Sequence, residues 1–518
     1  MSALTVTAAP ARPSRPVNVL RLSLGRLLRL ELRRSAMRWM LPLMLGVFWL
    51  DTYRASLALP ALWGSRALLL RQGQDVIDFA PFVAGAAAWA GGRDARGGIG
   101  DQLAAVALPR WAARLSAWAA TACWALTAYL LGVGALYAVT AGQGAPGDPL
   151  WWPVLVGAAA LTAVSALGYA AGVLLPSRFT APLTAIVAFD PLSVTYKTGG
   201  SLSLVSPMIS PSYAVAPLRA DAGVFSPYLP DQSLLQILFL GGLAVAALGA
   251  LGVQAVCGAP RLRRTAAVVV AAGLAALLTA VGLAGGYRVT EHGVVIPALH
   301  SAADDRPFAA TPVCAGAPVP VCLNPVYRAY LPTVGAMLDP LLREVAGLPG
   351  APVRVGQVPL TSRGGPSSAR LTGSPGGPDV GLDIGLDIGF DGMRSVGPDS
   401  GPGRCCTSDQ IWLSVPTATR QALPPIAIAV VDGLVGRTSP AQQAVSAGLL
   451  TALGVSASGP PDFPGAGDAA PPPAPEPGTP VYAAAQRFAA LPAASRHAWL
   501  AANLATLRAG TVPLEQLP

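Results

Sequence analysis

Residues 232–285 read QSLLQILFLGGLAVAALGALGVQAVCGAPRLRRTAAVVVAAGLAALLTAVGLAG, and this stretch decides the fold class. Two apolar runs, 232–257 and 266–285, flank a short turn that carries Arg261, Arg263 and Arg264. A helix needs about 20 mostly apolar residues to cross roughly 30 Å of hydrocarbon. Both runs have about that length, so the sequence predicts two membrane-spanning helices joined by a basic turn.

The same pattern recurs through the first half of the chain. Further apolar runs are predicted as spans: 37–50, which extends toward 57, 76–91, 115–140, 151–175 and 179–196. The whole chain is 53% hydrophobic and 12% charged, and its mean hydropathy is +0.51. Such a composition excludes an ordinary water-soluble protein. The predicted fold is a membrane all-α helical bundle of six or seven transmembrane helices followed by an α+β extracytoplasmic domain.

Positive charges lie in alternate gaps between the predicted spans. Arginines crowd the segment that ends at Arg38, the gap 92–114, Arg178 and the turn 261–264, whereas the opposite gaps hold few. Cytoplasmic loops of membrane proteins carry this excess. The N-terminus is therefore predicted to be cytoplasmic and residues 286–518, the tail, extracytoplasmic, in a multi-pass protein of the bacterial cytoplasmic membrane. The net charge of +9 then reflects topology in the lipid bilayer, with no nucleic acid as partner.

The segment 17–38 has an amphipathic pattern. Leu20, Leu24, Leu27 and Leu28 recur at helical spacing among arginines. This pattern favours a helix that lies in the membrane interface, and a generic retention signal is the alternative. Arginines also interrupt the first apolar run of the chain, which argues against a cleavable signal peptide.

Shifts in composition divide the chain into predicted segments. These are a cytoplasmic N-terminus with the interfacial helix, 1–36; a six-span membrane domain, 37–257; a cytoplasmic turn and seventh span, 258–285; an extracytoplasmic α+β domain, 286–458; a Pro-rich linker, 459–480; and a C-terminal helical segment, 481–518. Within the tail, 327–345 is predicted as a helix, and 353–360 and 411–415 as strands. Ser439 and Pro440 mark a helix start, and Gly454 marks a stop.

Four cysteines lie in the tail, in what is predicted to be an oxidising space: Cys314, Cys322, Cys405 and Cys406. A local bridge between Cys314 and Cys322 is the most economical pairing. Two crossed bridges between the first and second pairs are the alternative. A zinc site is disfavoured because no histidine stands near either pair, so no metal site is predicted.

No catalytic constellation is found. Lys197 is the only lysine, and no phosphate-binding loop surrounds it, so the chain is not itself an ATPase. Neither a His-Glu-x-x-His motif nor a Gly-x-Ser-x-Gly elbow occurs. Asp383, Asp387 and Asp391 recur every four residues, but their spacing does not fit an EF-hand, which favours a duplicated flexible loop over a calcium site. We predict no enzymatic activity and no bound cofactor.

The gap between the second and third predicted spans suits a partner-binding element. Ile99, Leu103 and Val106 fall on one face of a helix, so a short amphipathic segment can dock in a groove of a soluble partner. Charged residues beside it are candidates for setting the register of docking: Arg93, Asp94, Arg96 and Asp101. The alternative is a solvated loop whose arginines only enforce topology.

The gap, RDARGGIGDQL at 93–103 followed by Pro109 and Arg110, resembles the coupling segment of type-2 ATP-binding-cassette export permeases. In that family a charged stretch, Gly-Thr, an acidic residue, leucines and a Pro-x-Arg step precede a long third span. The matching positions are Gly98 for the glycine, Asp101 for the acidic residue, Leu103 for a leucine, and Pro109 with Arg110 for the closing step. The departures are Ile99 in place of threonine and Asp94 in place of glutamate.

The resemblance covers about residues 18–257. It implies a permease subunit that exports a substrate, with ATP bound and hydrolysed on a separate ABC ATPase subunit. It also implies a second permease subunit, in a homo- or heterodimer. A competing class is a membrane-anchored sensor or scaffold whose extracytoplasmic domain binds a ligand or partner.

Two features inside the predicted spans are an acidic residue beside a proline and a pair of glycines. Asp190 and Pro191 interrupt an apolar run, and their place in the chain resembles the gate region of the permease family. Asp190 is therefore the candidate acidic residue within the membrane. Alternatively, the span simply ends at Phe189. Gly168 and Gly172 form a small-xxx-small pair that would let helices approach closely. Because the chain holds 57 glycines, chance spacing is the favoured interpretation.

Overall fold

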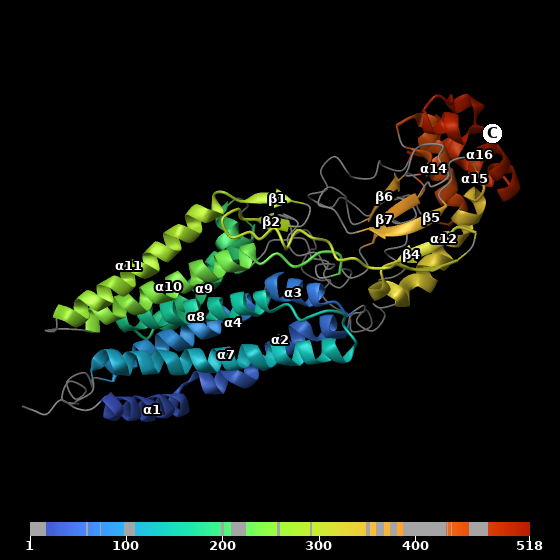
Figure 1. Ribbon diagram of the computed structural model, residues 1–518. Helices are drawn as coiled ribbons and strands as arrows, with labels where there is room; N and C mark the ends of the chain where they lie inside the picture. The colour runs from blue at the N-terminus through green and yellow to red at the C-terminus, as the bar shows by residue number, and fades with distance from the viewer. Residues whose placement is uncertain are drawn as a thin grey trace, which may run out of the picture.

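The computed structural model describes residues 17–57, 61–72, 74–97, 109–197, 201–208, 224–255, 260–290, 293–316, 318–348, 353–358, 367–372, 381–386, 431, 434–436, 438–454 and 475–518. A long helical bundle fills the first half of the described chain, and a smaller α+β unit lies beyond one of its ends (Figure 1). The apolar helical bundle and the small sheet agree with the prediction of a helical membrane protein.

The bundle consists of helices of very different length. In chain order they are α1 (Val17–Arg34), α2 (Met37–Leu57), α3 (Trp63–Gln72), α4 (Gln74–Gly91), α5 (Arg93–Arg96), α7 (Arg110–Gly142), α8 (Trp151–Leu174), α9 (Thr180–Lys197), η1 (Ser201–Val205), α10 (Asp231–Ala255) and α11 (Pro260–Ala284). Within the described residues, the helices α7, α8, α10 and α11 are long and apolar enough to cross a membrane. They contain the predicted spans 115–140, 151–175, 232–257 and 266–285, apart from residues at the ends.

Helices also form at the other predicted spans. In α2 and α9 the apolar portions, Met37–Leu50 and Thr180–Phe189, are shorter than a full span. Helix α9 runs through Asp190 and Pro191 to Lys197, so this pair does not end the helix, and the apolar portion of α9 ends at Phe189. A proline within a helix removes one backbone hydrogen bond without ending the helix when the surrounding structure holds the backbone. The short helix α3 was not predicted.

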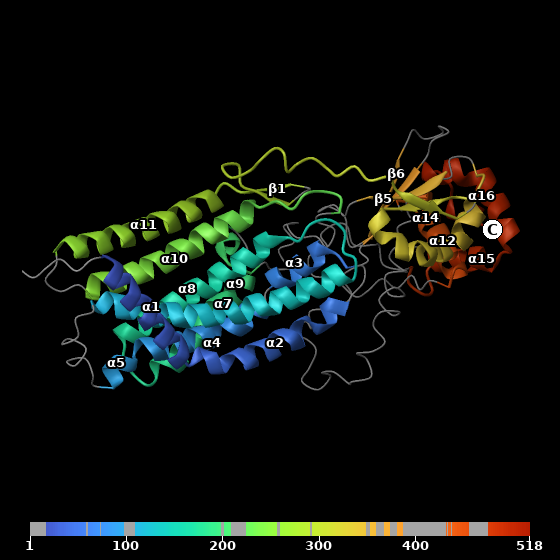
Figure 2. The same ribbon diagram turned by 60° about the horizontal axis from the view of Figure 1, so that its bottom comes forward.

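Helix α4 lies at the centre of the bundle, against α8 and α9 (Figure 2). Its contact with α8 depends on glycine. A Cβ atom at Gly168 would lie 3.0 Å from Ala84 Cα, and one at Gly172 would overlap the carbonyl oxygen of Ala88. The two glycines therefore let the backbones of α4 and α8 touch. Chance spacing, the interpretation favoured above, is wrong.

Helices α10 and α11 form an antiparallel hairpin that uses the same device. A Cβ atom at Gly273 would lie 2.7 Å from the carbonyl oxygen of Gly242 and 2.5 Å from Ala246 N. Much of the remaining surface of α11 is exposed and apolar, with Val268, Leu274 and Leu278 as examples. Such a surface suits hydrocarbon better than water.

The tail is built on a mixed sheet whose spatial order is β3-β4-β5-β7-β6. The strands are β3 (Val313–Ala315), β4 (Val321–Leu323), β5 (Arg354–Val358), β6 (Ser367–Thr372) and β7 (Gly381–Leu386). Strands β4, β5 and β7 are parallel, and β3 and β6 are antiparallel to their neighbours. Residues 381–386 were predicted as part of a flexible loop, which is wrong for them, because pairing with β5 and β6 supplies the backbone hydrogen bonds of β7. Residues 387–391 lie outside the described ranges.

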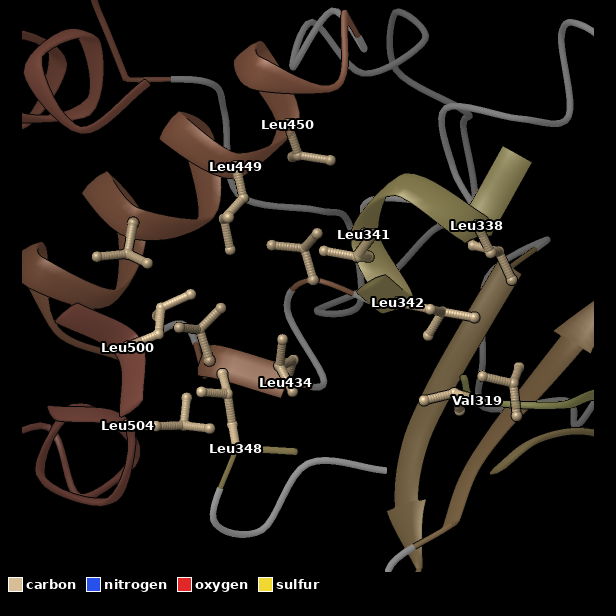
Figure 3. Close-up of a cluster of buried hydrophobic side chains, with 14 of the residues drawn as sticks. Val319, Leu338, Leu341, Leu342, Leu348, Leu434, Leu449, Leu450, Leu500 and Leu504 are labelled. Carbon is tan, nitrogen blue, oxygen red and sulfur yellow. The ribbon is translucent and has the colours of Figure 1, made fainter. Parts of the chain in front are cut away.

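Four helices complete the core of the tail: α12 (Leu331–Val345), α14 (Pro440–Ala452), α15 (Pro480–Ala490) and α16 (Ala493–Arg508). Helix α12 packs on β3 and β4, and the other three pack with one another and, through α16, with α12. Leu341 of α12, Leu449 of α14 and Leu500 of α16 converge in this core (Figure 3). Ser439 accepts a hydrogen bond from the Gln442 amide in a capping box, as its position before Pro440 predicted. The predicted C-terminal helical segment is two helices, which separate at Leu491 and Pro492.

The tail is seated on the end of the bundle that carries α3. Leu62, just before α3, and Val224, before α10, are buried in the same apolar cluster as the tail residues Val319 and Leu323. The amide of Phe308 donates a 2.7 Å hydrogen bond to the carbonyl oxygen of Phe225. The tail begins directly after α11 with a two-stranded hairpin of β1 (Arg288–Thr290) and β2 (Gly293–Val295) (Figure 1).

Cys314 of β3 and Cys322 of β4 are directly opposite each other and form a disulfide. Of the two pairing schemes considered above, the structure contains the local bridge. Cys405 and Cys406 lie outside the described residues. The two cysteines are eight residues apart in sequence. A short closed loop of this kind lowers the conformational entropy of the unfolded chain.

Replacing Cys322 with serine is expected to lower the free energy of unfolding of the tail by about 2–3 kcal/mol. Cys314 should become reactive toward a maleimide without reductant, as mass spectrometry of the intact chain would detect. Cys123 is free and exposed, and Cys123→Ser is the matched control that should leave tail stability unchanged. Equal stability of the two variants would contradict a structural role for the bridge.

Candidate functional site

The arginine-bearing helix ends meet at the end of the bundle opposite the tail (Figure 2). This region, the arginine end, contains α5, the C-terminal turns of α4, α8 and α10, and the N-terminal turns of α7, α9 and α11. Arg114 of α7 donates a 3.4 Å hydrogen bond to Gln254 of α10, which ties two of these turns together. Arg110, Arg261 and Arg264 are exposed there. The sequence predicted that these arginines would share one side of the membrane, and they share one end of the bundle.

Arg93 is the most firmly held of these arginines. Its Nη1 and Nη2 atoms each lie 3.0 Å from a different carboxylate oxygen of Glu31 in α1. This two-pronged pairing matches the planar guanidinium to the carboxylate. The side chain of Glu31 is 12% exposed and that of Arg93 is 42% exposed, so Arg93 keeps a solvent-facing surface. The hydrogen bond with Glu31 raises the pKa of Arg93 above its ordinary value.

Arg96, one turn after Gly92, folds back onto α4. Its guanidinium carbon lies 4.2 Å from the ring centroid of Trp89, a cation–π distance. Its Nη2 atom also donates to the carbonyl oxygen of Trp89. A Cβ atom at Gly92 would overlap Nη1 of Arg96 in this position and would lie 3.1 Å from the carbonyl oxygen of Gly172. Trp89 is half-exposed, so together these contacts form an aromatic and basic corner at the end of α4.

Helix α1 is fixed across this end by backbone and side-chain contacts. The indole Nε1 of Trp124 in α7 donates a 2.9 Å hydrogen bond to the carbonyl oxygen of Leu32. Leu27 and Leu28 are half-buried, whereas Arg26 and Arg29 are exposed. Arg33 and Arg34 are exposed as well. The predicted amphipathic helix therefore forms, with one face on the bundle and a basic face left free.

The predicted coupling residues fall into two groups. Arg93, Asp94 and Arg96 form α5, and Pro109 precedes Arg110, the first residue of α7. Pro109 has an extended ψ of 134°, which turns the chain into the long helix. Gly98, Asp101 and Leu103 lie outside the described residues, as does the amphipathic stretch around Ile99 and Val106. Asp94 lies 3.4 Å from Arg93.

The second predicted site, around Asp190 and Pro191, lies within α9, and their side chains are outside the described set. At the end of the bundle that carries the tail, the structure buries Arg66 of α3. Its Nε lies 3.3 Å from Thr140 Oγ1, and its Nη2 lies 3.4 Å from Gln143 Oε1. Burial lowers the pKa of Arg66 to about 10, which leaves the guanidinium charged at neutral pH.

Sequence reasoning missed Glu31 as the partner of Arg93 and Trp124 as the residue that bonds α7 to α1. Glu31 carried a usable signal, because it is the only acidic residue among the arginines of the segment 17–38. A lone carboxylate in such a segment is positioned to pair with one of the surrounding cations. Trp124 carried no such signal, since a tryptophan in an apolar run is ordinarily lipid-facing or packed.

Among the described residues, no group of three or more His, Cys, Asp or Glu side chains is arranged to hold a metal ion. The arginine end presents the cations of Arg93 and Arg96, the indole of Trp89 and packed helix ends. Such groups suit an acidic protein surface or lipid head groups. Comparison with protein-family models, with curated proteins and with solved structures found no match.

Proposed function

We propose that this chain is the permease subunit of an ATP-binding-cassette transporter that exports its substrate and uses a separate ATPase subunit. The observation that carries this proposal is the pairing of Arg93 with Glu31 at the arginine end. The pairing holds the start of the coupling segment against α1 while leaving part of Arg93 open to a partner. Coupling requires such an element, which must be both accessible to the motor and rigidly joined to the spans.

The helix ends around α5 supply the rigid connection. A Cβ atom at Gly91 would lie 3.2 Å from the backbone nitrogen of Val173, so α4 is packed tightly on α8 just before α5 begins. Trp124 joins α1 to α7. A push on α5 would therefore move α1, α4 and α8 together, because close-packed helices transmit displacement as bodies.

The proposed orientation follows from the charges. Arginine-rich turns remain on the cytoplasmic side of a membrane, so the arginine end would face the cytoplasm and the ATPase. The tail, at the opposite end of the bundle, would then be extracytoplasmic, where the Cys314–Cys322 bridge is stable. A second permease subunit, identical or related, would complete the pathway between paired membrane domains.

The test is purification of the tagged chain from membranes of its native host in a mild detergent. We expect a polypeptide with a Gly-Lys-Ser/Thr phosphate loop to copurify and to hydrolyse ATP. Arg93→Glu is expected to reduce the amount of copurified ATPase about tenfold, because a reversed charge at an interface repels a complementary partner. Recovery of the chain with no associated ATPase would favour the competing sensor or scaffold.

A charge exchange separates direct contact from a purely structural role of Arg93. The double variant Glu31→Arg, Arg93→Glu keeps opposite charges at the two positions and should restore the thermal stability of the chain. If Arg93 contacts the ATPase, copurification stays low in the double variant. Full recovery of the ATPase would show that Arg93 acts only by holding α1.

A further inference from the structure

A histidine lies between two carboxylates at the outer end of α10. Asp231 is the first residue of this helix, and its side chain is 0% exposed. Its Oδ2 atom lies 3.2 Å from Nδ1 of His300 and accepts a 2.9 Å hydrogen bond from the amide of Ile296. On the other side of the ring, Nε2 of His300 lies 3.1 Å from Oδ2 of Asp305. We call these three side chains the His300 clamp.

The clamp fastens the segment 296–312, the strap, which leads from β2 to β3, the edge strand of the five-stranded sheet. Below it lies an apolar cluster that includes Leu235, Ile296 and Ala284, all nearly inaccessible to solvent. This cluster keeps water from Asp231, whose Oδ1 has no hydrogen-bond partner among the described residues. The N-terminus of α10 favours the negative charge of the carboxylate. Asp305, by contrast, is 47% exposed.

The imidazole can bridge both carboxylates only in one protonation state. A neutral histidine donates from one ring nitrogen and presents a lone pair at the other, whereas the imidazolium donates from both. When His300 is neutral, one carboxylate oxygen therefore faces a lone pair and is repelled. Asp305 can turn to water and Asp231 cannot, so the contact that breaks is the one with Asp305.

We propose that the His300 clamp is a proton-operated latch, which fixes the strap to α10 when His300 is protonated and releases the strap when His300 is neutral. The proposal concerns the joint between bundle and tail and holds whether or not the chain is a permease. In the proposed extracytoplasmic orientation, it would make the seating of the strap respond to external pH.

The sign of the pH dependence follows from the surroundings of the ring. The hydrogen bond with Asp305 raises the pKa of His300, burial opposes the rise, and the charges of Asp231 and Asp305 add to it. The latch is therefore fully closed below the ordinary histidine pKa of about 6.5 and opens as pH rises through the higher value of the folded protein.

Other titratable or charged groups stand on the elements around the clamp. They are Tyr228 before α10, Tyr287 and Arg288 after α11, and Asp304 and Arg306 in the strap. The charges that shift the pKa of His300 are those of Asp231 and Asp305. Glu291 and His292 lie outside the described residues, and His292 is therefore included among the controls below.

The latch can be tested by hydrogen–deuterium exchange of the full chain in detergent, from about pH 5.5 to about pH 8.5, corrected for intrinsic exchange rates. Amides of the strap should lose protection as pH rises in the wild type. His300→Gln should abolish this pH dependence. Asp305→Asn, a change at an exposed position, should move the loss of protection to lower pH.

The chain has three histidines, which supplies matched controls. His497→Gln, in the tail, and His292→Gln should keep the wild-type pH profile of the strap. The proposal is overturned if strap protection in the wild type is constant across the range, or if His300→Gln retains the same profile. It is also overturned if either control substitution, and not His300→Gln, removes the pH dependence.

Discussion

Replacing Gly172 with valine is expected to prevent correct packing of the bundle. A Cβ atom at this position would overlap the carbonyl oxygen of Ala88 and lie 2.7 Å from its carbonyl carbon. These are backbone atoms of the central helix α4, so no side chain can rotate away to make room. Overpacking of a dense interior typically costs about 1–3 kcal/mol and occasionally more, and a clash with backbone atoms puts this substitution at the upper end, at about 3 kcal/mol.

The measurement is the monodisperse fraction in size-exclusion chromatography of detergent-solubilised chain, together with its thermal midpoint. Gly168→Val should behave similarly, because its Cβ atom would lie 2.5 Å from the carbonyl oxygen of Ala84. Gly134→Val in α7 is the matched control, since nothing among the described residues lies within 4 Å of a Cβ atom there. A monodisperse Gly172→Val protein with the wild-type midpoint would refute the tight α4–α8 contact.

Replacing Arg496 with methionine is expected to destabilise the tail by about 3–5 kcal/mol. Arg496 of α16 pairs through Nε and Nη2 with the carboxylate of Glu344 in α12. Its Nη1 donates to the carbonyl oxygens of Ala489 and Leu491, where α15 ends. Both charged residues are at least nine-tenths buried. Methionine would leave the Glu344 carboxylate buried without its cation, and an unpaired buried charge is among the most costly defects in a protein.

The neighbouring Arg343 supplies the control. Arg343 pairs with Asp339 on the exposed face of α12, and its side chain is 68% exposed. Arg343→Met should therefore change stability by less than about 0.5 kcal/mol. Limited proteolysis of the chain in increasing urea, followed through the peptides released from α12 and α16, would measure the stability of both variants. Replacing Arg496 and Glu344 together, by methionine and leucine, should recover part of the loss, because neither charge is then left unpaired. Equal urea midpoints for Arg496→Met and Arg343→Met would contradict the prediction.

Local features of the chain were predictable where a short stretch carries its own physical constraint. The apolar runs that contain α10 and α11 are long enough for hydrocarbon, and that length alone indicated their helices. Ser439 followed by Pro440 predicted the start of α14, because a hydroxyl cap satisfies amides within one turn. The strand at 381–386 was not predicted, because Gly381 and Gly385 masked a β pattern whose hydrogen bonds come from distant strands.

The candidate site shows the same division. Its basic character and its place before a long helix were readable from Arg93, Arg96 and Arg110, because charge excludes these residues from hydrocarbon. The partner of Arg93 was not readable, since Glu31 is 62 residues away and many arginines compete for it. Which arginine pairs with Glu31 depends on how α1 crosses α7, where Trp124 donates a hydrogen bond to the backbone of α1.

Apolar helices with arginines gathered on alternate turns could be predicted from the order of residues along the chain. Hydrophobic length and charge placement act over tens of residues at most, so they can be read along the chain. Only the tertiary structure decided which residues meet: Gly172 with Ala88, His300 with Asp231 at 69 residues' separation, and Arg496 with Glu344 at 152. These contacts arise because dense packing and the burial of charge select one arrangement of helices from many that the same pattern allows.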